Sequence, residues 1–238
     1  MKRALACLAL LSIGACTVTE TGNPSLALTA HTTDDRFWTV GPGAVVEHMW
    51  VVIGGMRFVS RDECAAASGV SQVSGPLIVD LVSGDVLEVN LADAEYCRLE
   101  VDYALGTAPL PEGAPAELAG AAFVIEGTTA DGQPLRIISR NPMRYRLDAN
   151  LTDFAVSPDE RSFILSVDVS DLLARVALGV TVERPDGSIV ISADENEAQL
   201  TVIEEDVERS LHLFRDADAD HVLDMEELAD PLAKLPEG

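Results

Sequence analysis

Short apolar runs that alternate with polar residues and end at turn signals constrain the fold of this chain more than any other feature. In residues 96–105, Cys97, Leu99, Val101 and Tyr103 alternate with polar side chains, the period of two that is typical of a half-buried strand. Similar runs recur from about residue 44 to residue 193. Hairpin signals separate two pairs of them, at Ala130-Asp131-Gly132-Gln133 and at Pro185-Asp186-Gly187.

Many short strands with turns between them favour a β-sandwich or barrel over a fold in which strands alternate with helices. We therefore predict a mainly-β domain over residues 44–193. Four of the apolar runs also resemble, in order and spacing, a family of bacterial lipoprotein domains of unknown function. That resemblance implies a transthyretin-like or immunoglobulin-like β-sandwich and carries no active residues with it. The matching stretches are 49–59, 75–81, 97–101 and 162–168.

The pattern changes near residue 193. Leu200, Ile203, Val207, Leu211 and Phe214 follow one another at spacings of 3, 4, 4 and 3, which predicts one apolar face of a helix. Residues 194–238 also carry 15 acidic and only 3 basic side chains. We therefore expect a separate acidic, helical tail over residues 194–238.

The predicted helix leads into a twelve-residue loop, Asp216 to Glu227, with acidic residues at positions 1, 3, 5, 9 and 12 and Leu223 at position 8. This spacing resembles the EF-hand, a helix–loop–helix unit that wraps six to eight oxygens around one Ca²⁺. The resemblance implies that calcium is the cofactor. It assigns side-chain oxygens of Asp216, Asp218 and Asp220, the carbonyl of Val222, Asp224 directly or through water, and both carboxylate oxygens of Glu227.

Three features of the loop depart from the EF-hand pattern. His221 stands where glycine usually supplies a positive φ, and Pro231 limits the exiting helix to little more than one turn. The chain has no second such loop with which Leu223 could pair. We expect weak binding for these reasons, with a Kd of roughly 10⁻⁴–10⁻³ M. The alternative is an acidic loop that is merely solvated.

The N-terminal residues predict where in the cell the protein is located. Met1-Lys2-Arg3 is basic, residues 4–13 are apolar, and Ile13-Gly14-Ala15-Cys16 resembles the lipobox of bacterial lipoproteins. The resemblance implies removal of a signal peptide over residues 1–15 and attachment of lipid to Cys16. Residues 16–43, rich in Thr, Ser and Gly in their first half, are expected to be a flexible tether. Thr17, which stands where an aspartate would favour retention in the inner membrane, favours the outer membrane or the cell surface. The alternative to a lipoprotein signal is an ordinary secretory signal.

Charge and cysteine content narrow the function further. Cleavage would remove Lys2 and Arg3 and leave 14 basic residues against 40 acidic ones, a net charge of −26, which excludes a nucleic-acid binder driven by phosphate contacts. The membrane partner would then be held through the lipid on Cys16. Cys64 and Cys97 remain as an even pair in an oxidising compartment, which predicts a disulfide that stabilises the fold by roughly 3–4 kcal/mol.

These features favour a calcium-binding, lipid-anchored protein with a structural or adhesive role. A glycan- or peptide-binding module is the alternative, with calcium as a structural or bridging ion. Trp38 and Trp50 are candidates for lining its groove, although core packing is the commoner fate of tryptophans. An enzyme is not expected, because the chain has no Gly-x-Ser-x-Gly elbow, no Gly-x-Gly-x-x-Gly turn and no phosphate loop. The basic cluster Arg136, Arg140, Arg144 and Arg146 suggests an anionic sugar ligand or, more simply, a solvated strand face.

Overall fold

A computed structural model describes residues 23–32, 39–40, 44–64, 73–150 and 153–234. β3 (Ala44–Ser60) is the longest strand and organises the sheet. Its central residues 49–53 are all buried, so both faces of the strand and both of its edges need partners. β7 (Phe123–Thr128) and β6 (Ala94–Tyr103) flank it, and β4 (Val73–Asp80) and β2 (Thr39–Val40) also pair with it.

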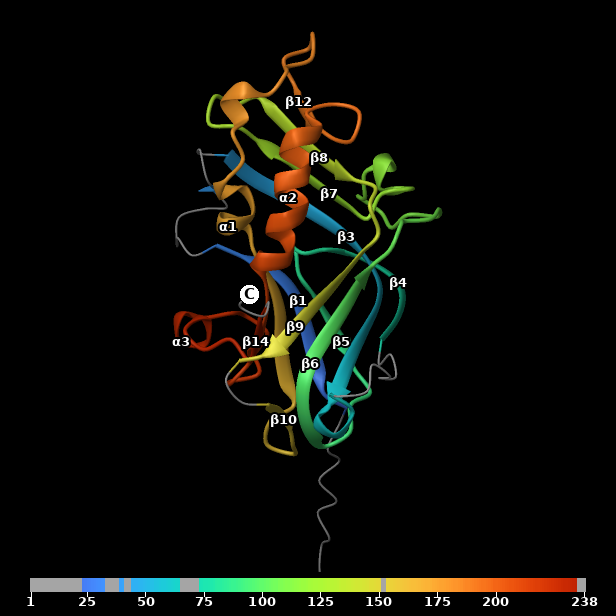
Figure 1. The fold of residues 1–238 in the computed structure, drawn as a ribbon, viewed down its shortest axis with the longest axis vertical. Coiled ribbons are helices and arrows are strands. Elements are labelled where there is room, and N and C mark those ends of the chain that lie inside the picture. Colours follow the sequence, from blue (N-terminus) through green and yellow to red (C-terminus); the bar gives the residue numbers. More distant parts are fainter. Residues whose placement is uncertain (1–22, 33–38, 41–43, 65–72, 151–152, 235–238) are drawn as a thin grey trace, which may run out of the picture.

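The strands form one curled, hydrogen-bonded sheet, so the mainly-β prediction is confirmed (Figure 1). The order along the sheet is β12-β8-β7-β3-β6-β9-β14-β13-β11-β1-β5, with β10 on β6. One continuous sheet replaces the two separate sheets of a sandwich. The remaining strands are β1 (Ser25–His31), β5 (Asp85–Glu88), β8 (Pro134–Ser139), β9 (Met143–Ala149), β10 (Phe154–Val156), β11 (Ser162–Asp168), β12 (Ile189–Ile191), β13 (Leu211–Arg215) and β14 (Ala233–Lys234).

The curl encloses the main core, and two helices cover part of it. α1 (Val169–Ala174) and α2 (Glu197–Ser210) pack on each other beside the sheet (Figure 1). α2 buries Leu200, Ile203 and Val207, the face that the helical spacing predicts. Short 3₁₀ turns cover 61–63, 116–118 and 178–180, and α3 (Met225–Leu228) follows the acidic loop. Among the described residues, no helix is long and apolar enough to cross a membrane.

The predicted tether is wrong over residues 25–31, because Ser25–His31 forms β1 in the interior of the sheet. β1 pairs in parallel with β11 and antiparallel with β5. Leu26 and Leu28 are fully buried in the main core, although their Ser- and Thr-rich surroundings are typical of a linker. The signal peptide and residues 16–22, 33–38 and 41–43 of the predicted tether lie outside the described residues.

The predicted boundary near residue 193 also differs from the structure. β13 and β14 belong to the same sheet as the preceding strands, so the acidic tail is part of the domain. The helix ends at Ser210, and Leu211–Arg215 continues as a strand between β11 and β14. The hairpin at 129–133 is confirmed, with Gly132 at a φ of 77°. The turn at 185–187 is closed by an antiparallel bridge between Glu183 and Ile189, and it leads into β12, which pairs in parallel with β8.

Candidate metal centre

The acidic loop begins where β13 ends and is fixed at that point by the sheet. The Asp216 N–H donates to the carbonyl of Ser162 on β11, at 3.1 Å. A strand therefore enters the loop, and the predicted helix–loop–helix entrance is wrong. The reason is that Leu211 and Leu213 are buried in the main core while Phe214 is buried on the opposite face, which is the alternation of a strand.

Asp216 is the buried member of the loop. Its side chain has no exposed surface. Its Oδ2 accepts hydrogen bonds from Ser162 Oγ at 2.6 Å and from the His221 N–H at 3.2 Å, and it lies 2.9 Å from His221 Nδ1. Its Oδ1 is buried and has no hydrogen-bond partner among the described residues. A buried carboxylate oxygen in that state is costly, and a bound cation would satisfy it.

Two more predicted ligands lie beside it. Asp216, Asp218 and Glu227 each offer a carboxylate oxygen, and these oxygens lie within 4.8 Å of one another. Oxygens bound to a single Ca²⁺ at about 2.3–2.6 Å are separated by no more than about 5 Å, so the cluster has the right size for one ion. The structure thus brings together three of the six predicted ligands.

Glu227 is held in place from two sides. Its Oε1 accepts the Ala217 N–H at 2.7 Å, and its Oε2 accepts the Asp224 N–H at 3.2 Å. Asp224 in turn caps α3, because its Oδ1 accepts the N–H groups of Glu226 and Glu227 at 2.8 and 2.9 Å. The carboxylate at loop position 12 is therefore tied to both the first and the last part of the loop.

Two of the other predicted ligands, Asp220 and Asp224, are not members of this cluster of side chains. Asp224 acts as the helix cap, and Asp220 Oδ1 accepts the Val222 N–H at 2.8 Å, which stabilises a local turn. Val222 is 63% exposed. The side chains of Asp220 and Asp224 shape the loop backbone in this structure.

The loop backbone has the strain predicted at His221 and a second strained position, Ala219, that was not predicted. His221 has a φ of 65° and Ala219 a φ of 59°. The left-handed region is costly for both residues. The His221 side chain, however, reaches back to Asp216 and lies 3.3 Å from Ser162 Oγ. A glycine at position 221 would relieve the strain but would lack this side-chain contact with Asp216. The spacing of acidic residues in the sequence does not predict the contact.

The prediction that Leu223 has no internal partner is wrong. Leu223 and Leu228 pack against Ala27, Ile164 and Phe214, which form a small core on the outer face of β1, β11 and β13. Leu223 is therefore packed against the sheet. Ser162 and Ser25, whose Oγ atoms lie 2.9 Å apart, complete the surroundings of Asp216, and no spacing in the sequence points to either serine.

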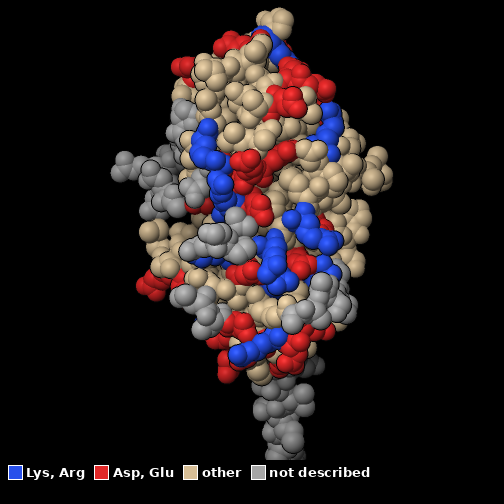
Figure 2. Space-filling view, in the orientation of Figure 1, with Lys and Arg blue, Asp and Glu red and all other residues tan. Residues whose placement is uncertain are grey.

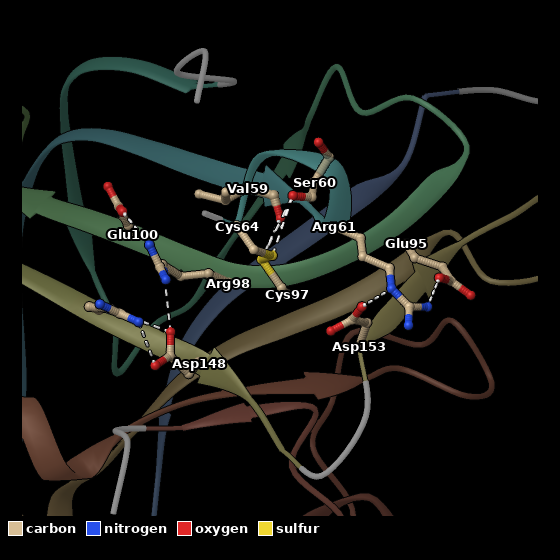
Figure 3. The surroundings of a disulfide bond; sticks show 11 residues. Val59, Ser60, Arg61, Cys64, Glu95, Cys97, Arg98, Glu100, Asp148 and Asp153 are labelled. Carbon is tan, nitrogen blue, oxygen red and sulfur yellow. Dashed lines mark hydrogen bonds and ion pairs between the residues drawn. A yellow bond between two sulfur atoms is a disulfide. The ribbon is translucent and has the colours of Figure 1, made fainter. Parts of the chain in front are cut away.

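The predicted disulfide is confirmed. Cys64, just after β3, is bonded to Cys97 on β6 (Figure 3). Ion pairs surround it: Arg98 lies between Glu100 and Asp148, and Arg61 binds Glu95 and Asp153. Cys16, the predicted lipidation site, lies outside the described residues.

The predicted basic cluster is split by the fold. Arg136 and Arg140 lie on a groove of about 700 Å³, where they pair with Glu117 and Glu126 and with Asp194, respectively. Arg144 and Arg146 lie on β9. Arg144 pairs with Asp102 of β6, and Arg146 pairs with Asp148 of β9 itself. Figure 2 shows basic and acidic side chains interspersed on the face in view.

Trp50 has the commoner of its two predicted positions, in a core. Trp50 is only 8% exposed and packs in a second small core with Val52, Val124 and Ile138. Trp38 lies outside the described residues. The tryptophan-lined glycan groove therefore has no support at Trp50.

No family model matches the chain, and no curated protein matches it. Among solved structures, the chain is similar to MbnP from Methylosinus trichosporium, with 10% sequence identity and a TM-score of 0.38. The match covers 68% of this chain and 82% of the other. The function proposed below rests on the residues of this chain alone.

Proposed function

We propose that this protein is a calcium-binding lipoprotein in which a curled β-domain carries one ion at the loop 216–227. The observation that carries the proposal is Asp216. Its carboxylate is buried, and one oxygen has no hydrogen-bond partner in the described residues. Asp218 and Glu227 each offer a carboxylate oxygen within 4.8 Å of the other and of an Asp216 oxygen. A hard dication would neutralise all three groups at once.

Calcium is the best candidate among cations for two reasons. All three clustered side chains are carboxylates, the hard oxygen ligands that Ca²⁺ prefers, and no His or Cys belongs to the cluster in the described residues. The loop also keeps the EF-hand spacing, with Glu227 at the position of the bidentate ligand. Binding would bring Asp220 and the Val222 carbonyl toward the ion to complete its shell.

The physiological role that fits these features is structural. The loop is packed on the sheet through Leu223, and the lipid expected on Cys16 would hold the domain at the outer membrane or the cell surface. An adhesive role toward a protein or glycan is compatible with that location. Calcium would then stiffen the domain rather than take part in chemistry.

Calorimetric titration of calcium into the Cys16→Ser protein tests the proposal. Glu227→Gln should weaken binding at least tenfold, because it removes the charge of the bidentate ligand. Glu226→Gln is the matched control, since it makes the same change at an exposed neighbour whose side chain is outside the cluster. Absence of heat in the parent protein, or equal binding by both variants, would refute the proposal.

A further inference from the structure

Along the order of paired strands, the two parts of the sheet are joined through one very short strand. On the opposite side Leu81 also links them, because its carbonyl accepts the Ala30 N–H of β1 and its N–H donates to the Met49 carbonyl of β3. β12 to β9 form one part and β13 to β5 the other, and β14 lies between them. β14 has two residues, with Ala233 opposite both Ala149 of β9 and Leu213 of β13. Leu232 adds two backbone hydrogen bonds, to the Leu213 carbonyl at 2.7 Å and from the Asn150 N–H at 2.8 Å.

The position of β14 depends on the acidic loop 216–227, which precedes it closely in the chain. Glu227 lies on α3, and the chain reaches Ala233 only six residues later. The Asp230 N–H donates to the Glu227 carbonyl at 3.2 Å, which carries the position of α3 into the segment before β14. Any movement of Glu227 away from Asp216 would therefore be passed to β14.

Electrostatics gives the loop a reason to move. Three carboxylates within 4.8 Å of one another repel when no cation lies between them. Asp216 cannot withdraw, because it is buried at the end of β13, whereas Glu227 is on a four-residue helix with a single turn. Without the ion, the repulsion acts chiefly on α3 and on the strand that follows it.

We propose that calcium acts as a clasp for the sheet: the ion holds Glu227 against Asp216 and thereby keeps β14 between β9 and β13. The inference rests on the proposed function, since it needs calcium at this loop. Two residues of strand form too short a ladder to persist without that support. Loss of the ion would release β14 and open the backbone edges of β9 and β13, while the core continues to hold the rest of the domain.

Hydrogen exchange with and without calcium tests the clasp on the Cys16→Ser protein, after calorimetry has measured the affinity. With saturating calcium, amides in β14 and those at its contacts, Asn150 and β13, should exchange at least tenfold more slowly than in chelator. Exchange in β7 and β8 is the internal control and should change much less. Glu226→Gln should behave like the parent, whereas Glu227→Gln should show less of the calcium-dependent protection at a calcium concentration that saturates only the parent.

The outcomes separate the two proposals. Binding with protection confined to residues 216–228, or with equal protection in β7 and β8, would overturn the clasp and leave the calcium site in place. No binding by calorimetry would overturn both.

Discussion

At the scale of single residues, Asp216 decides what the loop can do. One carboxylate oxygen is fully used by Ser162 and His221, and the other is buried without a partner among the described residues. That asymmetry fixes the direction of the carboxylate while leaving one oxygen to bind an ion. Exposed loop residues such as Asp218 add charge but cannot be held as firmly.

Asp216→Asn tests this role with little change in shape. With chelator, the unfolding free energy of the variant should lie within about 1 kcal/mol of the parent, because the amide oxygen can still accept from Ser162. Calcium at ten times the Kd of the parent should raise the stability of the parent by about 1.4 kcal/mol and leave the variant unchanged. Urea denaturation measures both values, and an equal rise in the variant would contradict the assignment.

His31 gives the domain a dependence on pH that is separate from the loop. Burial lowers the pKa of His31, the nearby Asp168 charge opposes that shift, and His212 adds to it. The unfolded chain therefore binds the proton more readily than the folded one. The contribution to stability is complete above the ordinary pKa of 6.5 and is lost as the pH falls through the lower pKa of the folded protein.

We expect the parent to lose more unfolding free energy than His31→Gln when the pH falls from about 7.5 to about 5.5. Denaturant titrations in chelator at the two pH values measure the difference, and the comparison removes the titration of carboxylates that both proteins share. The same loss in both proteins would show that His31 is not responsible.

At the scale of elements, the segment after α2 shows both the reach and the limit of sequence reasoning. The helical spacing correctly predicts the buried face through Val207, and it fails at Leu211, where the strand β13 begins. Residues 211–214 fit either period, because Leu211 and Phe214 lie three apart. Residues 211–215 form a strand because they pair with β11 and because the acidic loop 216–227 covers their outer face. The local spacing of apolar residues indicates neither of these contacts.

Leu223 and Val222 test how far the loop depends on that outer face. Leu223→Ala should lower stability by about 1–2 kcal/mol, less than a fully buried leucine would, and weaken calcium binding several-fold, because the loop loses its contact with Phe214. Val222→Ala should change little, since that side chain is 63% exposed and only its carbonyl is a predicted ligand. Equal effects of the two changes would contradict the packing role.

At the scale of the whole molecule, the mainly-β class and the Cys64–Cys97 disulfide were predictable, because alternation and an even pair of cysteines are local or compositional signals. The places of β1 and β14 within the sheet could not be predicted from the sequence. β1 joins β11, 137 residues away at Ser25 and Ser162, and β14 inserts between β9 and β13. Pairings between residues so far apart in the chain leave no signal in the local spacing of apolar residues.

The lipid anchor is a property of the whole molecule and stays a prediction. Cys16→Ser should move the protein from the membrane fraction to the soluble fraction of cells that process lipoproteins, because a net charge of −26 offers no attraction to anionic lipid. Fractionation with detection of the protein measures this. Continued association with membranes would mean that another segment or a partner holds it.

A crystal structure grown with millimolar calcium tests the central claim most directly. We expect one ion, identified by anomalous scattering, within about 2.3–2.6 Å of Asp216 Oδ1 and of oxygens from Asp218 and Glu227. An ion bound elsewhere, or a loop that stays without an ion while Asp216 Oδ1 is met by a protein group, would contradict the account.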